Sequence, residues 1–178
     1  LNGGAAVSRG FELASAVGVT NALRLRGSWS YTRAELSVDS PGLLDGGADA
    51  FAGDRLSGAP RQQGSLLASW AALLGGDVAF DIQYGYSYVG DVLTRIGMRA
   101  GGERLPAYDL HNVSASVSKD AWRLTFYVEN LLDEYAVTGV RQTPDLIGFT
   151  DDGFRSRRYF ASVLAPRRIG VRMRYALW

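Results

Sequence analysis

Residues 167–178 read Arg-Arg-Ile-Gly-Val-Arg-Met-Arg-Tyr-Ala-Leu-Trp, and this stretch decides the fold class. Apolar side chains recur at every second position from Ile169 to Leu177, and Arg168, Arg172 and Arg174 lie between them. Because successive side chains of a strand point to opposite faces, the pattern predicts a strand with one apolar and one cationic face. The apolar face must cover either a protein core or a lipid bilayer, and the rest of the sequence distinguishes the two.

The same period-two alternation recurs in six further segments, so we expect about seven strands in all. The predicted strands cover residues 5–17, 22–35, 61–73, 77–90, 108–118, 121–132 and 167–178. Each is 11 to 14 residues long, which exceeds the ~5–6 residues typical of globular proteins. Such lengths match strands that cross a bilayer at a tilt.

The predicted connections alternate between short and long. Tight turns rich in glycine, asparagine and aspartate are expected at residues 17–21, 74–77 and 118–120, and long links at residues 36–60, 91–106 and 136–165. Structureless links of this length are unusual in compact soluble domains. Short turns at one end and long loops at the other are typical of outer-membrane barrels, in which the short turns are periplasmic.

Aromatic residues on the predicted apolar faces form two groups. The group expected at the periplasmic rim is Trp70, Phe80, Trp122 and Tyr175, and the group expected at the outer rim is Phe11, Trp29, Tyr31, Tyr86 and Tyr88. Two aromatic girdles are typical of a transmembrane barrel. The alternative is a half-buried sheet in a soluble sandwich or lipocalin-like barrel, in which the same alternation arises.

Composition excludes several classes of function. The net charge is +1, which gives no general attraction to nucleic acid. The chain has no cysteine and one histidine, so disulfides, cysteine-based redox chemistry and histidine metal sites are not expected. Residues 1–4 contain no initiator methionine and no targeting pattern, so we expect the sequence to begin within a domain. Seven is also an odd number for a bacterial barrel, so either one strand is unrecognised or the chain is part of a larger barrel.

Four motifs resemble the C-terminal half of TonB-dependent receptor barrels. They are Gly10-Phe11-Glu12-Leu13, the segment 58–64, the segment 128–135 and the closing strand 166–178. The third contains Asn130, Leu131, Asp133 and Tyr135 in the order of the family's Asn-Leu-Phe-Asp-x-x-Tyr segment, with Leu132 in place of phenylalanine. The fourth ends in Tyr175 and Trp178, three residues apart, whereas the family usually ends in Tyr-x-Phe on one face.

The resemblance implies an all-β fold in which residues 1–178 are the C-terminal portion of a larger, 22-stranded barrel. The plug domain and the N-terminal barrel strands are then absent from this sequence. It implies an importer in the outer membrane of a Gram-negative bacterium for scarce, bulky ligands such as ferric siderophores, haem, cobalamin or glycans. The implied partners are outer-membrane lipid, the plug, the TonB complex through the absent N-terminal part, and the barrel-assembly machinery; no cofactor and no catalysis are implied.

Ligand contacts are expected in the long link before the last strand. This link contains arginines next to aromatic residues, a combination that can bind an anionic ligand. The candidates are Arg155, Arg157, Arg158, Tyr159 and Phe160. On the predicted lumen face, Glu129 and Arg123 contact the plug or pair with neighbouring strands. His111 and Asp109 share a face, but no serine stands in a nucleophile-elbow context, so a hydrolase is disfavoured. The competing functions are a passive outer-membrane channel, a small eight-stranded barrel, a hydrolase and a soluble binding module.

Overall fold

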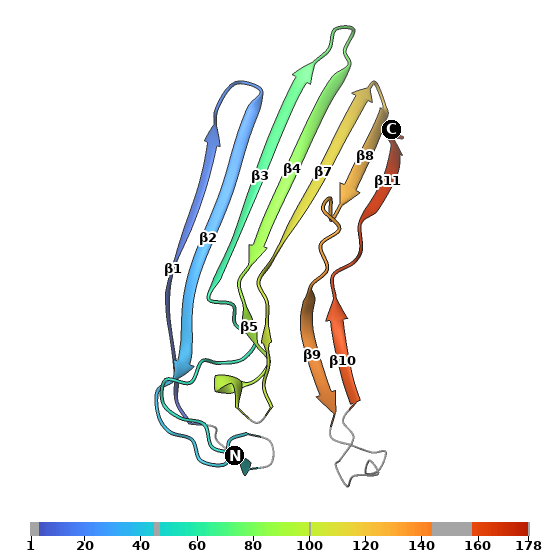
Figure 1. The fold of residues 1–178 in the computed structure, drawn as a ribbon. Helices are drawn as coiled ribbons and strands as arrows, with labels where there is room; N and C mark the ends of the chain where they lie inside the picture. Colours follow the sequence, from blue (N-terminus) through green and yellow to red (C-terminus); the bar gives the residue numbers. More distant parts are fainter. Residues whose placement is uncertain (1–3, 45–46, 100, 144–157, 178) are drawn as a thin grey trace.

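The computed structural model describes residues 4–44, 47–99, 101–143 and 158–177, and within them seven strands form one antiparallel sheet (Figure 1). The strand order is β1-β2-β3-β4-β7-β8-β11, so each strand pairs with the next long strand along the chain. The strands are β1 Ala6–Gly18, β2 Leu23–Leu36, β3 Gln62–Leu73, β4 Ala79–Val89, β7 Tyr108–Lys119, β8 Trp122–Glu129 and β11 Arg168–Tyr175. All seven predicted strands are confirmed, with ends that shift by a few residues.

The short turns lie together at one end of the sheet and the long connections at the other (Figure 1). In the turn between β3 and β4, Gly75, Gly76 and Asp77 have φ values of 51°, 62° and 60°. In the turn between β7 and β8, Asp120 has φ 50°. Glycine adopts this left-handed region readily and aspartate tolerates it, which explains why the sequence reverses at these points.

Cross-strand register places most apolar side chains of the seven strands on one face, the apolar face, and the arginines of β8 and β11 on the other, the polar face. One row across the sheet is Val17, Leu25, Ala68, Tyr84, Val113, Val128 and Ile169. This row begins one residue from the turn end of β1 and finishes one residue from the loop end of β11. The alternation predicted for each strand is therefore confirmed in a single continuous register.

The two aromatic groups are confirmed as ring pairs at opposite ends of the apolar face. Toward the turns, Trp122 contacts Tyr175 with ring centroids 4.6 Å apart, and Trp70 contacts Phe80 at 6.0 Å. Toward the loops, the Phe11 and Tyr31 rings stack at 5.9 Å and the Trp29 and Tyr88 rings at 5.7 Å. The last pair spans two strand-to-strand steps, because Gly64 lies between the two residues and the Trp29 ring occupies the space that a side chain there would fill.

The long links contain structure that the sequence did not predict. Residues 91–106 hold a hairpin of β5 (Val92–Leu93) and β6 (Arg104–Leu105) with a short 3₁₀ helix, η2 (Ile96–Met98), between them. A second hairpin pairs β9 (Val137–Thr143) with β10 (Arg158–Val163) beyond the ends of β8 and β11 (Figure 1). Residues that were expected to form unstructured loops therefore extend the sheet's ends as separate hairpins.

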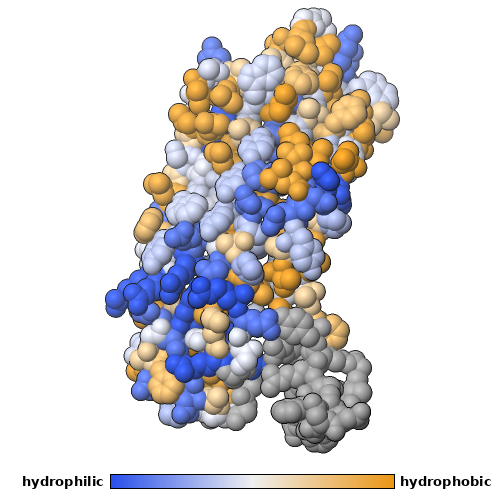
Figure 2. Space-filling model, viewed as in Figure 1, coloured by the Kyte–Doolittle hydropathy of each residue, from blue (hydrophilic) through white to orange (hydrophobic). Residues whose placement is uncertain are grey.

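Buried apolar residues lie mainly at the loop end rather than in the sheet. Leu36, Ala50, Leu93 and Leu105 are buried, whereas Ile169 on the apolar face is 77% exposed. Figure 2 shows hydrophobic side chains over much of the upper half of the view, nearest the short turns, and hydrophilic ones gathered at the lower left near the loop end of β1 and β2. No helix among the described residues is long and apolar enough to cross a membrane.

Candidate functional site: the polar face and the loop end

Ion pairs connect the strands of the polar face. The guanidinium of Arg168 on β11 lies 2.5 Å from the carboxylate of Glu129 on β8. Arg123 on β8 reaches across β7 and donates a hydrogen bond to Asp81 on β4. The sequence left open whether Arg123 and Glu129 pair with neighbouring strands; Glu129 pairs with the adjacent strand β11, and Arg123 with β4, one strand beyond its neighbour β7.

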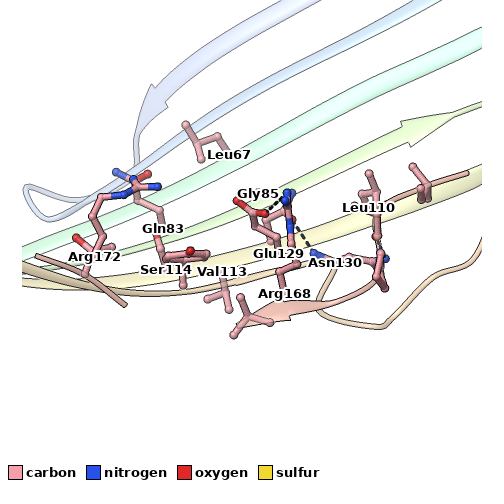
Figure 3. Close-up of a pocket in the computed structure, with 17 residues that line it drawn as sticks. Leu67, Gln83, Gly85, Leu110, Val113, Ser114, Glu129, Asn130, Arg168 and Arg172 are labelled. Carbon is pink, nitrogen blue, oxygen red and sulfur yellow. Dashed lines mark hydrogen bonds and ion pairs between the residues drawn. The ribbon is translucent and has the colours of Figure 1, made fainter. Parts of the chain in front are cut away.

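A pocket of about 610 Å³ lies on the polar face beside these ion pairs (Figure 3). Its lining includes Gln83, Asn112, Tyr127, Glu129, Arg168 and Arg172. The Arg172 guanidinium carbon is 5.5 Å from the centre of the Tyr127 ring, within the range of a cation–π contact. Figure 3 shows Glu129 and Arg168 pointing toward one another, so their charges are mutually neutralised while Gln83 and Arg172 line the hollow. Apolar side chains, among them Leu67, Leu110 and Leu164, also line the hollow, so its surface is a mixture of polar and apolar groups.

Asn130 forms the junction between the sheet and the β9–β10 hairpin. Its side chain donates to the carbonyls of Glu134 (2.9 Å) and Ala165 (3.0 Å) and accepts from the Glu134 amide (2.8 Å). Its backbone has φ 53°, a conformation that asparagine tolerates better than most residues. The buried Asn130 side chain therefore marks the end of β8 and holds the segment around Ala165, just before β11, close to that end.

The other residues of the same motif support this junction or lie outside it. Asp133 accepts a hydrogen bond from the Arg167 amide at 2.8 Å, and Leu131 donates to the carbonyl of His111 at 2.7 Å. Tyr135 is 73% exposed. Tyr175 contacts Trp122 on the apolar face, and Trp178 lies outside the described residues. The motif found in the sequence therefore has a structural explanation in Asn130 and Asp133.

The loop end holds a compact unit, here called the loop cap, made of residues 34–44, 47–61 and 90–107 apart from residue 100. Its first part continues the ladder of β2, since the Leu36 amide donates to the Asp54 carbonyl and the Leu56 amide to the Ala34 carbonyl, both at 2.9 Å. The Arg55 side chain is 10% exposed and lies 2.7 Å from the Asp91 carboxylate. Arg55 therefore joins two loops that are far apart in the sequence.

A second ion pair joins the same two loops. The Arg99 guanidinium lies 2.5 Å from the Asp54 carboxylate and 4.5 Å from the centre of the Phe51 ring. The hydrogen bond from Arg99 holds the pKa of the Asp54 carboxyl below its ordinary value, although burial acts in the opposite direction. Burial raises the pKa of Asp91, but the hydrogen bond and charge of Arg55 outweigh it, so this pKa also lies below its ordinary value.

The predicted ligand-contacting residues are only partly described. Arg155 and Arg157 lie outside the described residues. Arg158, Tyr159 and Phe160 belong to strand β10 rather than to a loop, and the Phe160 side chain is 54% exposed. Their contact with a ligand stays a prediction.

His111 lies on the apolar face near the loop end, where it is hydrogen-bonded on both sides. Its Nδ1 is 2.6 Å from the Tyr84 hydroxyl and its Nε2 is 3.1 Å from the Asp109 carboxylate. The β4–β7 register is continuous through this region, so no bulge interrupts it. Among the described residues, no group of three or more His, Asp or Glu side chains is placed to hold a metal ion.

Sequence reasoning missed the residues that build the loop cap and the partner of Arg123. Arg55 and Asp91 are 36 positions apart, and Asp81 and Arg123 are 42 apart, so no local pattern pairs them. For Asp81 and Arg123 a signal was available, because both fall on the predicted polar face at nearby heights. The two loop-cap pairs had no comparable signal.

The sequence profile described as "TonB dependent receptor-like, beta-barrel" matches residues 1–131. The chain belongs to this family. Receptor barrels of this TonB-dependent family lie in the outer membrane of Gram-negative bacteria. No curated protein sequence matches the chain significantly.

Three solved TonB-dependent receptor structures share the fold. The ferric yersiniabactin uptake receptor FyuA from Yersinia pestis matches with a TM-score of 0.76 and 18% identity over 99% of this chain and 24% of that chain. The siderophore receptor PiuA from Acinetobacter baumannii matches with a TM-score of 0.68 and 17% identity over 94% of this chain and 21% of that chain. The ferric-catecholate import receptor Fiu from E. coli K12 matches with a TM-score of 0.62 and 16% identity over 93% of this chain and 20% of that chain. The chain thus spans about a quarter or less of these receptors.

Proposed function

We propose that residues 1–178 form the C-terminal portion of the barrel of an energised outer-membrane importer. The observation that carries the proposal is the single seven-stranded sheet whose apolar face is continuous and whose polar face is ion-paired, in a chain of the TonB-dependent receptor family. Within the described residues, β1 and β11 each pair on one side only. Because unpaired strand edges are not tolerated in lipid, further strands of the same barrel would cover them.

A ferric siderophore is the ligand class that we favour. The three similar receptors are described as taking up ferric yersiniabactin, a siderophore and a ferric catecholate, respectively. In this chain, Arg155, Arg157, Arg158, Tyr159 and Phe160 are the candidates for contact with such an anionic complex. Arginine forks bind carboxylate and catecholate-like oxygens, and aromatic rings pack on planar ligand groups.

The polar face supports the proposal of a plugged lumen driven through the TonB complex. The 610 Å³ pocket is lined by Gln83, Asn112 and Arg172, which offer hydrogen bonds to a protein surface. A folded plug presents side chains that can fill such a hollow. The absent N-terminal part would carry the contact with the TonB complex.

The test is uptake by the protein as produced from its own gene in a Gram-negative strain that lacks other iron receptors. We expect growth on ferric siderophores under iron chelation, and loss of that growth when TonB is deleted. Uptake that survives TonB deletion would identify a passive channel instead. Growth restored only by haem, cobalamin or a glycan would support the import function but contradict a ferric siderophore as the ligand.

A matched pair of variants tests the ligand contacts. The triple variant Arg155→Gln, Arg157→Gln and Arg158→Gln should weaken siderophore binding about tenfold, because charge-assisted hydrogen bonds are lost. Arg174→Gln, which removes one charge from the polar face near the turn end, should leave binding unchanged. Equal siderophore binding by the triple variant and the wild type would show that these arginines do not contact the ligand, and it would leave the proposed import function unaffected.

A further inference from the structure

Two arginines lie directly opposite each other on the apolar face, at the loop end of β1 and β2. Arg9 is the register partner of Arg33. Side chains of directly opposed residues start only about 4.5–5.5 Å apart, and like charges in this arrangement are destabilising. An anion that contacts both guanidinium groups would offset this repulsion.

The pair lies where the apolar face meets the membrane surface. The next row toward the short turns is Phe11 and Tyr31, whose rings stack at 5.9 Å, and the row after it is Leu13 and Trp29. Aromatic girdles mark the boundary between acyl chains and headgroups. The loop end is the extracellular end, so both guanidinium groups reach the headgroup layer of the outer leaflet on their long apolar stems.

Only part of the positive charge is neutralised by the chain. The Arg33 Nε donates to the Glu35 carboxylate at 2.7 Å, and no other hydrogen bond of Arg33 is made to the described residues. Within the same described residues, Arg9 has no carboxylate in ion-pair range, and it is exposed. Glu35 thus orients one guanidinium and leaves its terminal nitrogens available, while Arg9 has no ion-pair partner in the part of the chain that the structure describes.

We propose that Arg9 and Arg33 form a binding site for a phosphate group of an anionic lipid in the outer leaflet. A guanidinium matches the geometry of phosphate oxygens and can bind two of them at once. The phosphate relieves the repulsion between the two arginines, and the Phe11 and Tyr31 rings lie against the apolar part of the same lipid. The site depends on the outer-membrane location of the apolar face and not on which ligand is imported.

The first experiment measures lipid retention by the protein as produced from its own gene. The protein is placed in phosphatidylcholine nanodiscs that contain a small fraction of bisphosphorylated lipid A, and bound lipid A is measured. Arg9→Gln with Arg33→Gln should weaken retention about tenfold, whereas Arg9→Lys with Arg33→Lys should weaken it less. The matched control, Arg24→Gln with Arg26→Gln, removes equal charge from the polar face of β2 and should match the wild type.

The comparison ligands separate the sources of phosphate. Lipid A from which both phosphates have been removed should not be retained, and millimolar inorganic phosphate should not displace the bisphosphorylated form. Equal retention by the Arg9→Gln, Arg33→Gln variant and the wild type would overturn the proposal. Full displacement by inorganic phosphate would also overturn it, because the site would then take a free anion.

A stability measurement distinguishes lipid binding from a merely structural role. In a zwitterionic detergent without lipid A, Arg9→Gln should raise the unfolding temperature, because it removes the repulsion from Arg33. The stabilisation gained on adding lipid A should be smaller in the variant than in the wild type. A variant that is less stable in both conditions by the same amount would show that Arg9 serves the fold alone.

Discussion

In the loop cap, Leu36, Ala50 and Leu93 expose 3%, 0% and 4% of their surface, whereas Leu13, Ile169 and Met173 in the sheet expose 66%, 77% and 67%. The cap buries these apolar residues within the chain, although Val38, Phe51 and Met98 at its surface stay exposed. The described chain leaves the apolar face of the sheet uncovered, and we propose that lipid covers it. Ladder hydrogen bonds and ion pairs on the polar face hold the sheet together. The two regions therefore respond to different perturbations.

The largest expected effect comes from placing a charge on the apolar face of the sheet. Ile82→Arg sets a guanidinium between the two aromatic girdles and should cost about 2–4 kcal/mol of folding free energy. Gln83→Arg, on the polar face of the same strand, is the matched control and should cost less than about 1 kcal/mol. Unfolding by urea in lipid vesicles measures both, and equal costs would contradict the assignment of the two faces.

Breaking an ion pair of the loop cap should have a local effect of about 2 kcal/mol. Asp91→Asn leaves the Arg55 guanidinium, which is 10% exposed, without its carboxylate. Hydrogen exchange of the Leu56 and Gly58 amides should accelerate while the sheet keeps its protection. Arg55→Met combined with Asp91→Leu should restore part of the protection. Unchanged exchange in Asp91→Asn would show that the loops hold together without this pair.

The junction between the sheet and the β9–β10 hairpin should respond to Asn130→Ala by about 1–2 kcal/mol. The substitution removes three side-chain hydrogen bonds and leaves the carbonyl of Ala165 without its donor. Asn130→Gly also loses these bonds, but glycine adopts φ 53° without strain. Comparing the two variants therefore separates the loss of hydrogen bonds from the backbone strain of alanine. Protease sensitivity near residue 136 measures the effect. Resistance equal to that of the wild type in both variants would assign the junction to Asp133 and Arg167.

Acid should loosen the loop cap before the sheet, with the smallest expected effect. The folded-state pKa values of Asp54 and Asp91 lie below the ordinary value of about 3.9. Their contribution to stability is therefore complete above that value and is lost as pH falls through the lower folded-state values. Exchange of the Leu36 and Leu56 amides, corrected for intrinsic rates, should rise as the pH falls below about 3.9. A matching rise for amides in the middle of β3 would contradict the separation of the two regions.

The sheet could be predicted from the sequence because its information is local. Alternation along each strand fixes which side chains share a face, and glycine and aspartate mark the turns, so the faces of β2, β8 and β11 followed directly from residue order. The loop cap could not be predicted, because Arg55 with Asp91 and Asp54 with Arg99 are contacts between distant segments. The β9–β10 hairpin was missed because Val137–Thr143 interrupts its alternation with Gly139 and polar residues.

The long row from Val17 on β1 to Ile169 on β11 also determines the tilt of the strands. Val17 stands one residue before the turn end of β1, whereas Ile169 stands six residues before Tyr175, the turn end of β11. The offset is therefore five residues over six strand-to-strand steps, or about 0.8 residue per step. With a rise of about 3.3 Å per residue and strands about 4.8 Å apart, the strands slope by about 30° to the barrel axis. Any neighbouring strands must continue this slope, so this sheet already specifies the shear of the barrel.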